Sequence, residues 1–251
     1  MTQTEILVRS TLDGSMQPSL FYRSPLPGKR PLLIGLHTWS HNRFNQINNF
    51  LPYAEKLGFH LLLPEFRGPN LTGNPHCTEA CVSDYALQDV KDAVDSLLPS
   101  GNIDEDGILL LGHSGGGLMA LMLAAKWPEL FRAVGAYVPI TDLAVWADEN
   151  ANYREHVLAC CSGSKEEMAK RSPIYHLAEI SRANVKLFHG KHDPTVPVSH
   201  SIRFFSRMTE EYPSARVFLD VFDGGHEIDM DQAMYWLLSQ YDKRALTQVT
   251  G

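Results

Sequence analysis

Residues 108–117 read Ile-Leu-Leu-Leu-Gly-His-Ser-Gly-Gly-Gly, and this stretch decides the fold. Its apolar half predicts a buried strand, the pattern Gly-x-Ser-x-Gly follows, and residues 118–126 continue as a helix. A serine at the apex of such a tight turn takes a strained backbone conformation, so its neighbours must be small. Gly112 and Gly116 provide that space. Because a strand precedes the pattern and a helix follows it, we interpret Ser114 as a nucleophile rather than part of a chance glycine-rich loop.

A nucleophilic serine needs two partners, and the later strands supply candidates for both. Its hydroxyl requires a histidine to accept the proton and a carboxylate to orient that histidine. On a sheet of parallel strands these partners lie in loops after later strands, in the order Ser, Asp, His. Asp193 follows the predicted strand 185–188, and His226 follows the predicted strand 215–221. They are therefore the predicted acid and base.

The same loops contain competing residues. Asp193 could merely cap the turn that it forms with Pro194, which is a common role for Asp before Pro. Asp220 and Asp223 lie too close to His226 in the sequence to approach it from a separate loop. The remaining histidines share the loop of the acid or begin the helix after it, and structural roles are assigned to them: His189, His192 and His200.

The oxyanion of an acyl-transfer intermediate needs two backbone N–H donors. One is expected from Gly115, directly after the nucleophile, and the other from the loop after the predicted strand 31–36. In that loop Trp39 is the preferred donor and Thr38 the alternative, while His37 is interpreted as a residue that holds the shape of the loop. Trp39 is also expected to narrow the acyl pocket, and the other predicted pocket residues are Thr38, His113, Trp146 and Val196.

Strands and helices alternate along the chain, which predicts an α/β fold with a mostly parallel central sheet covered by helices on both faces. A hairpin around residues 13–14 is predicted at the start of the chain. Residues 140–182 are predicted to form a short helical cap over the site. The alternative is that this segment lies on the surface without contact to substrate. No linker is visible, so residues 1–251 are predicted to form one domain. The expected strands are 5–11, 19–23, 31–36, 59–64, 108–111, 133–138, 185–188 and 215–221, and the expected helices are 45–57, 84–98, 118–126 and 230–241.

Composition narrows the function classes. The chain has 251 residues, of which 44% are hydrophobic and 20% charged, as in an ordinary globular enzyme. The net charge of −7, without a basic cluster, argues against nucleic acid or an anionic membrane as a partner. The N-terminus lacks the features of a secretion signal and no apolar stretch reaches the length of a membrane span, so the cytoplasm is the expected compartment. The oligomeric state is left open.

The cysteines suggest neither a metal nor a secreted disulfide framework. Cys77 and Cys81 form one group and Cys160 and Cys161 another, without the spacing of a zinc site. The first two could pair if their loop curled, but reduced structural thiols are expected. We therefore predict no metal and no organic cofactor.

Several segments beyond the serine turn carry a family resemblance. They include Gly58-Phe59, Phe66-Arg67-Gly68, Asp84-Tyr85, Asp89-Val90, residues 124–131, Arg171-Ser172-Pro173 and residues 189–197. Together with the turn they resemble an α/β-hydrolase and, within that superfamily, the catalytic domain of the prolyl oligopeptidase family. The resemblance runs from about Gly58 to His226 and implies triad roles for Ser114, Asp193 and His226.

The chain also departs from that family in two respects, which we take to weaken peptidase activity as the main function. From the sequence we expect no propeller domain before the opening hairpin, and the usual His-Gly-Gly is His-Thr-Trp at residues 37–39. The sequence therefore predicts a serine hydrolase that cleaves small-molecule carboxylic esters of small or medium acyl groups through an acyl-enzyme. A prolyl oligopeptidase-like peptidase or aminopeptidase with the same triad is the alternative, and a non-catalytic ligand-binding protein is a more distant one.

Overall fold

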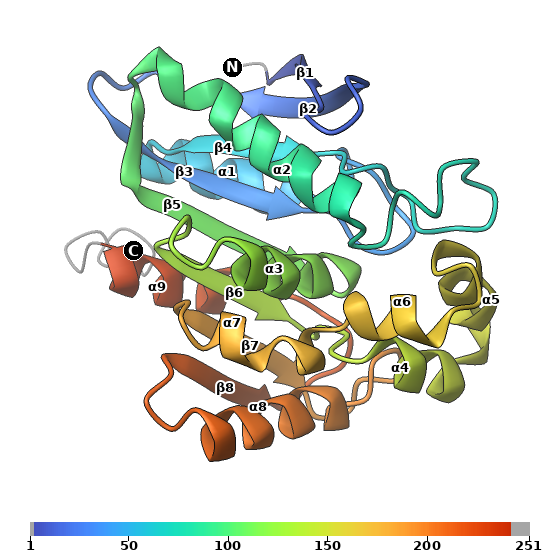
Figure 1. Cartoon of the computed structure of the whole chain (residues 1–251). Coiled ribbons are helices and arrows are strands. Elements are labelled where there is room, and N and C mark those ends of the chain that lie inside the picture. Colours follow the sequence, from blue (N-terminus) through green and yellow to red (C-terminus); the bar gives the residue numbers. More distant parts are fainter. Residues whose placement is uncertain (1–2, 242–251) are drawn as a thin grey trace.

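The computed structural model describes residues 3–241, whose strands form one eight-stranded sheet (Figure 1). The strands are β1 (Thr4–Arg9), β2 (Met16–Tyr22), β3 (Arg30–Leu36), β4 (His60–Pro64), β5 (Ile103–His113), β6 (Ala133–Tyr137), β7 (Val185–Gly190) and β8 (Val217–Phe222). Their spatial order is β1-β2-β4-β3-β5-β6-β7-β8. Within the described residues, β2 pairs antiparallel with β1 and β4, and every other pair of strands is parallel. The predicted mostly parallel sheet is confirmed; that residues 1–251 form one domain stays a prediction, because both chain ends lie outside the described residues.

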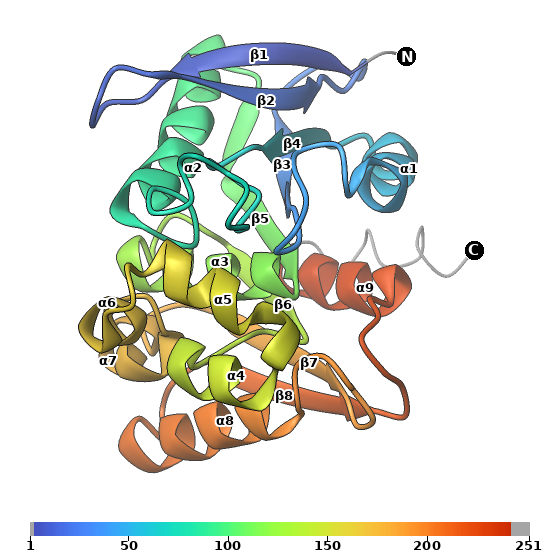
Figure 2. The same ribbon diagram turned by 90° about the vertical axis from the view of Figure 1, so that its right-hand side faces the viewer.

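Helices cover both faces of the sheet, as predicted (Figure 2). On one face lie α1 (Ile47–Leu57) and α9 (Met230–Tyr241), and on the other α2 (Asp84–Leu97), α3 (Gly115–Lys126) and α8 (Ser199–Glu211). Local sequence fixes their ends: Gly58 terminates α1 at a φ of 66°, and the Ser83 hydroxyl caps α2 by accepting the N–H of Ala86. Within residues 3–241, no helix combines the length and apolarity needed to cross a membrane.

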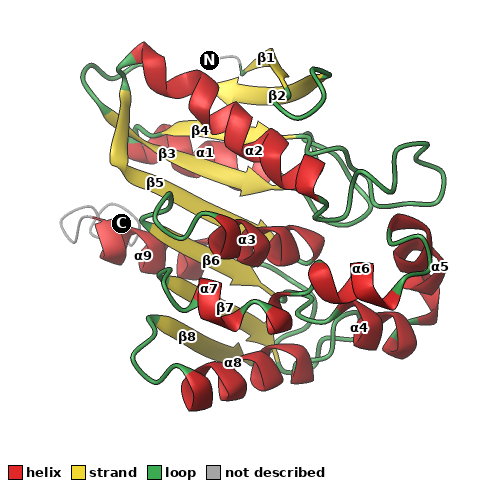
Figure 3. Ribbon diagram, viewed as in Figure 1, coloured by secondary structure: helices red, strands yellow, loops and turns green. Residues whose placement is uncertain are grey.

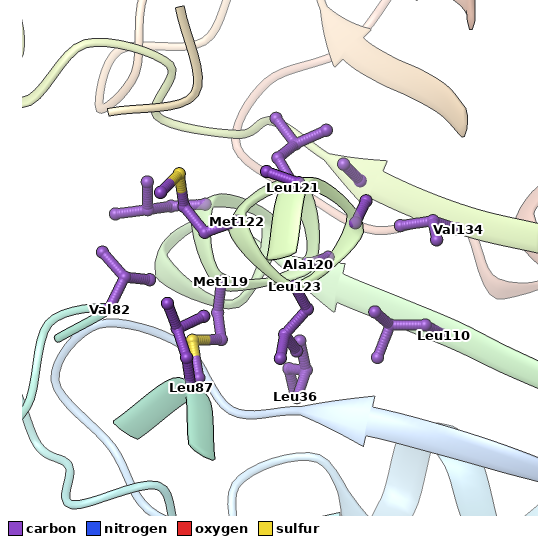
Figure 4. Close-up of a cluster of buried hydrophobic side chains, with 14 of the residues drawn as sticks. Leu36, Val82, Leu87, Leu110, Met119, Ala120, Leu121, Met122, Leu123 and Val134 are labelled. Atoms are coloured by element: carbon purple, nitrogen blue, oxygen red, sulfur yellow. The ribbon is translucent and has the colours of Figure 1, made fainter. Parts of the chain in front are cut away.

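The central helix α3 is buried along almost its whole length, and this fixes the serine turn. Every residue from Gly115 to Ala125 is buried, as expected for a helix that is apolar on all sides. Figure 4 shows its side chains packed among residues of β3, β5, β6 and the start of α2, including Leu36, Leu110 and Leu87. The first turn of α3 therefore cannot shift without disturbing the core, and Ser114 directly precedes that turn.

Residues 140–182 fold as short helices, which confirms the expected secondary structure of this segment. They are α4 (Leu143–Glu149), α5 (Ala151–Cys160), α6 (Lys165–Lys170), η2 (Pro173–Tyr175) and α7 (Leu177–Ile180). Figure 1 places α4, α5 and α6 beyond the carboxyl ends of the parallel strands, the edge where α/β folds carry their sites. We call α4, α5 and α6 the cap.

Strand β5 is longer than the sequence pattern predicts. It begins at Ile103, although residues 104–106 are all acidic and do not read as a strand. Pairing with β3 explains the extension: Arg30 lies opposite Ile103, and the register shifts before Leu32 pairs with Ile108. Residues 104–107 fall within this irregularity, between the two paired residues of β5, so no alternation in the sequence marks the extension.

Candidate active site

Ser114 occupies the strained turn that the sequence predicts. Its φ of 59° and ψ of −118° are unusual for a non-glycine residue, and its N–H donates to the Tyr137 carbonyl at 2.9 Å. A Cβ on Gly112 would lie 2.0 Å from the carbonyl oxygen of Gly116, so only glycine fits there. One on Gly116 would lie 2.8 Å from the His37 carbonyl oxygen. Both positions require glycine because neighbouring backbone atoms lie too close to leave room for a Cβ.

A chain of hydrogen bonds joins the three predicted triad residues. The Ser114 hydroxyl lies 3.0 Å from Nε2 of His226, whose Nδ1 lies 2.7 Å from Oδ2 of Asp193. The Asp193 side chain is fully buried, and 21% of the His226 side chain is exposed. These contacts join the start of α3 to the loops after β7 and β8. This is the geometry that a nucleophile, a base and an orienting acid require.

Asp193 also caps its own turn, so both interpretations of this residue apply at once. While Oδ2 faces His226, Oδ1 accepts the backbone N–H groups of Thr195 at 2.7 Å and Val196 at 2.9 Å. Burial alone would raise the pKa of Asp193, but hydrogen bonds from His226 and from these N–H groups outweigh it, so the pKa is lowered. The carboxylate is therefore held ionised and in one orientation.

The other histidines and acids of these loops make structural contacts. His189 is buried, with Nδ1 2.7 Å from the Ser201 hydroxyl and Nε2 2.8 Å from the Val196 carbonyl oxygen, and it holds the loop of Asp193. His200 lies in the first turn of α8. The remaining pairs lie away from the triad: His192 with Asp223 at 2.9 Å, His200 with Glu149 at 3.1 Å and Lys186 with Asp220 at 3.2 Å.

Two backbone N–H groups beside Ser114 are free to bind an oxyanion. A Cβ on Gly115 would lie 2.7 Å from the Trp39 nitrogen, so these two backbones lie side by side. Within residues 3–241, neither N–H has a hydrogen-bond acceptor. The alternative donor, Thr38, already donates its N–H to Oδ1 of Asn45 at 3.2 Å. The geometry therefore favours Trp39 over Thr38. His37, whose Nε2 donates to the Glu65 carbonyl at 2.6 Å, holds the shape of this loop.

The predicted pocket residues differ in their surroundings. Thr38 is half-buried and its hydroxyl donates to Asn45, and His113 is half-buried beside His226, with 5.0 Å between ring centres. Trp146 and Val196 are fully buried. Trp146 donates its indole N–H to the Thr195 carbonyl at 2.9 Å, and Val196 donates its backbone N–H to Oδ1 of Asp193. Both side chains pack in the interior, and a role for these two residues in a substrate pocket stays a prediction.

The Trp39 side chain lies beneath the cap rather than in open space. Only 2% of it is exposed, and its ring contacts Trp146 at 4.9 Å and Tyr153 at 6.3 Å between centres. Sequence reasoning missed Tyr153, and no pattern could have found it, because Tyr153 lies on α5 while Trp39 follows β3. This cluster of three rings couples the cap to the candidate oxyanion loop.

Arg67 is a second residue whose role the sequence did not reveal. Its guanidinium is buried and contacts Asp89 at 2.6 Å, Glu79 at 2.5 Å and Asp13 at 2.8 Å. These carboxylates come from α2, from the segment before it and from the opening hairpin. The segments that contain Arg67 and Asp89 were noted for their resemblance, but only the fold shows that the two residues pair.

The half-buried His113 and the fully buried His200 predict how the free energy of unfolding depends on pH. Burial, followed by the charge of His226, lowers the pKa of His113 to about 4, and burial, followed by the charge of Arg203, lowers that of His200 to about 3. Between these values and the ordinary 6.5, the unfolded chain binds more protons than the folded one. The free energy of unfolding should therefore fall as pH drops from about 6.5 to about 4, by up to about 1.4 kcal/mol per pH unit for each group.

Denaturant unfolding at a series of pH values measures this slope. His200→Gln should reduce it by up to about 1.4 kcal/mol per pH unit. His192→Gln is the matched control, because the His192 side chain is 63% exposed, and it should leave the slope unchanged. Equal slopes for the two variants would contradict the assignment of His200 as a buried neutral group.

The fold and the hydrogen-bonded Ser114, His226 and Asp193 define an α/β-hydrolase. Residues 46–242 match the prolyl oligopeptidase family, and the chain belongs to that family. Among curated relatives, the acylamino-acid-releasing enzyme of Arabidopsis thaliana is 26% identical over 226 residues, covering 82% of this chain and 28% of that enzyme. The enzyme of the same name from Mus musculus is 26% identical over 219 residues, covering 81% and 29%.

Solved structures show the same fold. The acylaminoacyl peptidase of Pyrococcus horikoshii superposes with a TM-score of 0.74 at 14% identity, covering 95% of this chain and 41% of that one. Oligopeptidase B from Leishmania major gives a TM-score of 0.74 at 17% identity, covering 99% and 37%. This chain spans less than a third of the length of the plant and mouse enzymes. The family resemblance read from the sequence is confirmed.

Proposed function

We propose that this chain is a serine peptidase that cleaves short substrates after an N-acylated amino acid. The observation that carries the proposal is the hydrogen-bonded chain of Ser114, His226 and Asp193 in a member of the prolyl oligopeptidase family. The names of the relatives, acylamino-acid-releasing enzymes, support the N-acylated substrate. The ester hydrolase predicted from the sequence as the main function fits these comparisons less well than the peptidase alternative.

In the proposed mechanism, Ser114 Oγ attacks the scissile carbonyl carbon while Nε2 of His226 accepts the hydroxyl proton. Asp193 holds the other ring nitrogen and stabilises the imidazolium that forms. The N–H groups of Gly115 and Trp39 donate to the oxyanion, aided by the positive end of α3. Collapse of this intermediate breaks the C–N bond and leaves an acyl-enzyme.

His226 then has a second task, which distinguishes amides from esters. The amine leaves only when protonated, so His226 must transfer the proton it took from Ser114 to the departing nitrogen. A water molecule next attacks the acyl-enzyme, again with His226 as the base. The 2.7 Å contact with the buried Asp193 supports this task, because it fixes the ring in one orientation through both transfers.

Parallel kinetics on one preparation test the substrate class. The substrates are N-acetyl-alanyl p-nitroanilide, alanyl p-nitroanilide and a series of p-nitrophenyl acyl esters, each compared with its uncatalysed rate. We expect turnover of the acetylated anilide, with a kcat/KM at least about tenfold above that of the free amine, a difference of about 1.4 kcal/mol in transition-state binding.

Two results would contradict the proposal. Turnover of the esters alone, with both anilides at their uncatalysed rates, would favour the ester hydrolase. Preference for the free amine would favour an aminopeptidase with the same triad. The variant Ser114→Ala, assayed alongside, separates turnover by this site from that of a contaminant.

A further inference from the structure

The carbonyl oxygen of Thr195 accepts two hydrogen bonds from the cap. The indole N–H of Trp146, on α4, donates to it at 2.9 Å, and the side-chain NH₂ of Asn150, between α4 and α5, also donates at 2.9 Å. The Trp146 side chain is fully buried and Asn150 is half-buried. The cap is therefore tied to the loop that carries Asp193.

The peptide unit between Thr195 and Val196 extends this contact to Asp193 itself. The unit is trans, so its C=O and N–H groups lie in one plane and point in opposite directions. Its oxygen faces Trp146 and Asn150, and its N–H, that of Val196, donates to Oδ1 of Asp193 at 2.9 Å. Holding the oxygen therefore fixes the direction of the N–H group. Hydrogen bonds to the oxygen also polarise the unit, which makes the N–H a stronger donor.

The ring of Trp146 contacts the other half of the candidate active site. Its centre lies 4.9 Å from that of the Trp39 ring, and the two rings meet edge to face at 64°. Such a pair favours one relative orientation of the rings. The backbone N–H of Trp39 is the candidate oxyanion donor. One side chain therefore contacts both loops, the loop of Asp193 through its N–H and the candidate oxyanion loop through its ring.

Helix α4, which carries Trp146, is itself held at both ends. At its start, the N–H of Leu143 donates to the hydroxyl of the buried Ser172 at 2.8 Å. At its end, Glu149 lies 3.1 Å from Nε2 of His200, in the first turn of α8. Because α4 is fixed to other parts of the fold, it can support the two loops that Trp146 contacts.

We propose that Trp146 is a positioning residue, which holds the carboxylate of Asp193 and the backbone of Trp39 in fixed relative places. The inference rests on the triad of the proposed function and extends its support to the cap. Catalysis by such a triad depends on the mutual placement of the base and the oxyanion donors. Losing this support should therefore lower kcat while KM changes little.

Conservative variants remove the two donors to the Thr195 carbonyl one at a time. Trp146→Phe removes the indole N–H and keeps an aromatic ring beside Trp39. Asn150→Ser removes the second donor, and the serine can still cap α5 as Asn150 does. Either donor alone can hold the carbonyl, so we expect each single variant to lose about fivefold in kcat. The double variant should lose about a hundredfold, more than the product of the two, with KM within about threefold of the wild type.

Proton NMR reports on the orientation of Asp193 without any substrate. The Nδ1–H of His226 donates to Oδ2 of Asp193 at 2.7 Å, and we expect a far-downfield resonance from this proton that is missing from His226→Gln. In the double variant this proton should exchange faster with water and its resonance should broaden, because Oδ1 of Asp193 is held less firmly. Asn150→Ser alone should broaden it to a smaller extent, so the test does not require Trp146→Phe to fold.

Trp236→Phe is the matched control. Trp236 is also a buried indole, but it lies on α9 and packs in the core on the other face of the sheet. Its replacement should lower the melting temperature and leave kcat and the resonance unchanged. A double variant with the wild-type resonance, or with a loss of kcat no larger than that of Trp236→Phe, would overturn the proposal. If the wild type hydrolyses esters alone, the proposed substrate class fails, while kcat on esters and the resonance still decide the role of Trp146.

Discussion

Replacing Ser114 by alanine is expected to lower kcat by a factor on the order of 10⁴–10⁶, the largest effect of any single substitution in this chain. Without the hydroxyl no acyl-enzyme can form, and only the N–H donors and substrate binding remain to accelerate the reaction. The fold should persist, because the hydroxyl makes its hydrogen bond with His226 alone among the described residues, and alanine tolerates a φ of 59° about as well as serine. Steady-state kinetics and the melting temperature measure the two effects separately.

Ser100→Ala is the matched control for this variant. Ser100 lies at the end of the short helical segment before β5, at the opposite end of that strand from the serine turn. Its replacement should leave both kcat and the melting temperature unchanged. If Ser114→Ala kept more than about 1% of wild-type turnover, a loss of less than about 2.7 kcal/mol, the nucleophile would have to be another residue.

Asp193→Asn is expected to lower kcat by about 10⁴, the size of the corresponding effect in the best-known triad. The amide oxygen can still accept the N–H groups of Thr195 and Val196, so the turn should survive. The amide NH₂ then takes the place of Oδ2 opposite His226, and a donor there favours the tautomer whose Nε2 carries the proton. Such a ring cannot accept the proton of Ser114. KM should change little, because Asp193 is buried behind His226.

Asp223→Asn is the control for this second variant. Asp223 also lies in the loop after β8, but its side chain is 91% exposed and its partner is the exposed His192. We expect less than about a threefold loss of kcat, as for a surface substitution. The reverse ranking, with Asp223→Asn the more severe, would move the acid to the loop after β8.

The sequence was sufficient for the central part of the fold because local rules and tertiary structure agree there. The glycines around Ser114 are needed for close backbone approach, and α3 is apolar on all sides because it lies between the sheet and neighbouring helices. The order of loops along a parallel sheet also pointed to Asp193 and His226. In each case a local motif, or the order of the strands along the chain, was enough to predict the structure.

Features that depend on distant pairs could not be predicted. The spacing of the cysteines allowed Cys77 to pair with Cys81 but favoured reduced thiols, and it gave no sign that Arg171 donates to the backbone carbonyls of both Cys81 and Cys160. Arg67 likewise forms ion pairs with carboxylates from three separate segments. Such arrangements depend on how the loop before α2 packs against the cap and the hairpin, and no periodicity in the sequence records that packing.

The substrate class was the least secure inference from sequence. Trp39 suggested a narrow acyl pocket and hence small esters, but its ring packs against Trp146 and Tyr153 beneath the cap. The identity of one side chain in the oxyanion loop therefore says little about the leaving group. Family membership and the fixed His226 instead support amide hydrolysis.

Covalent labelling tests most directly whether Ser114 is a nucleophile that His226 activates. A fluorophosphonate probe reacts with a serine that a neighbouring base activates, and the adduct can be located in the tryptic peptide 92–126. That peptide contains Ser96, Ser100 and Ser114, so fragmentation must assign the modified residue. We predict one adduct, on Ser114, which is absent from Ser114→Ala and strongly slowed in His226→Gln. An adduct on another serine, or undiminished labelling of Ser114→Ala, would contradict the account.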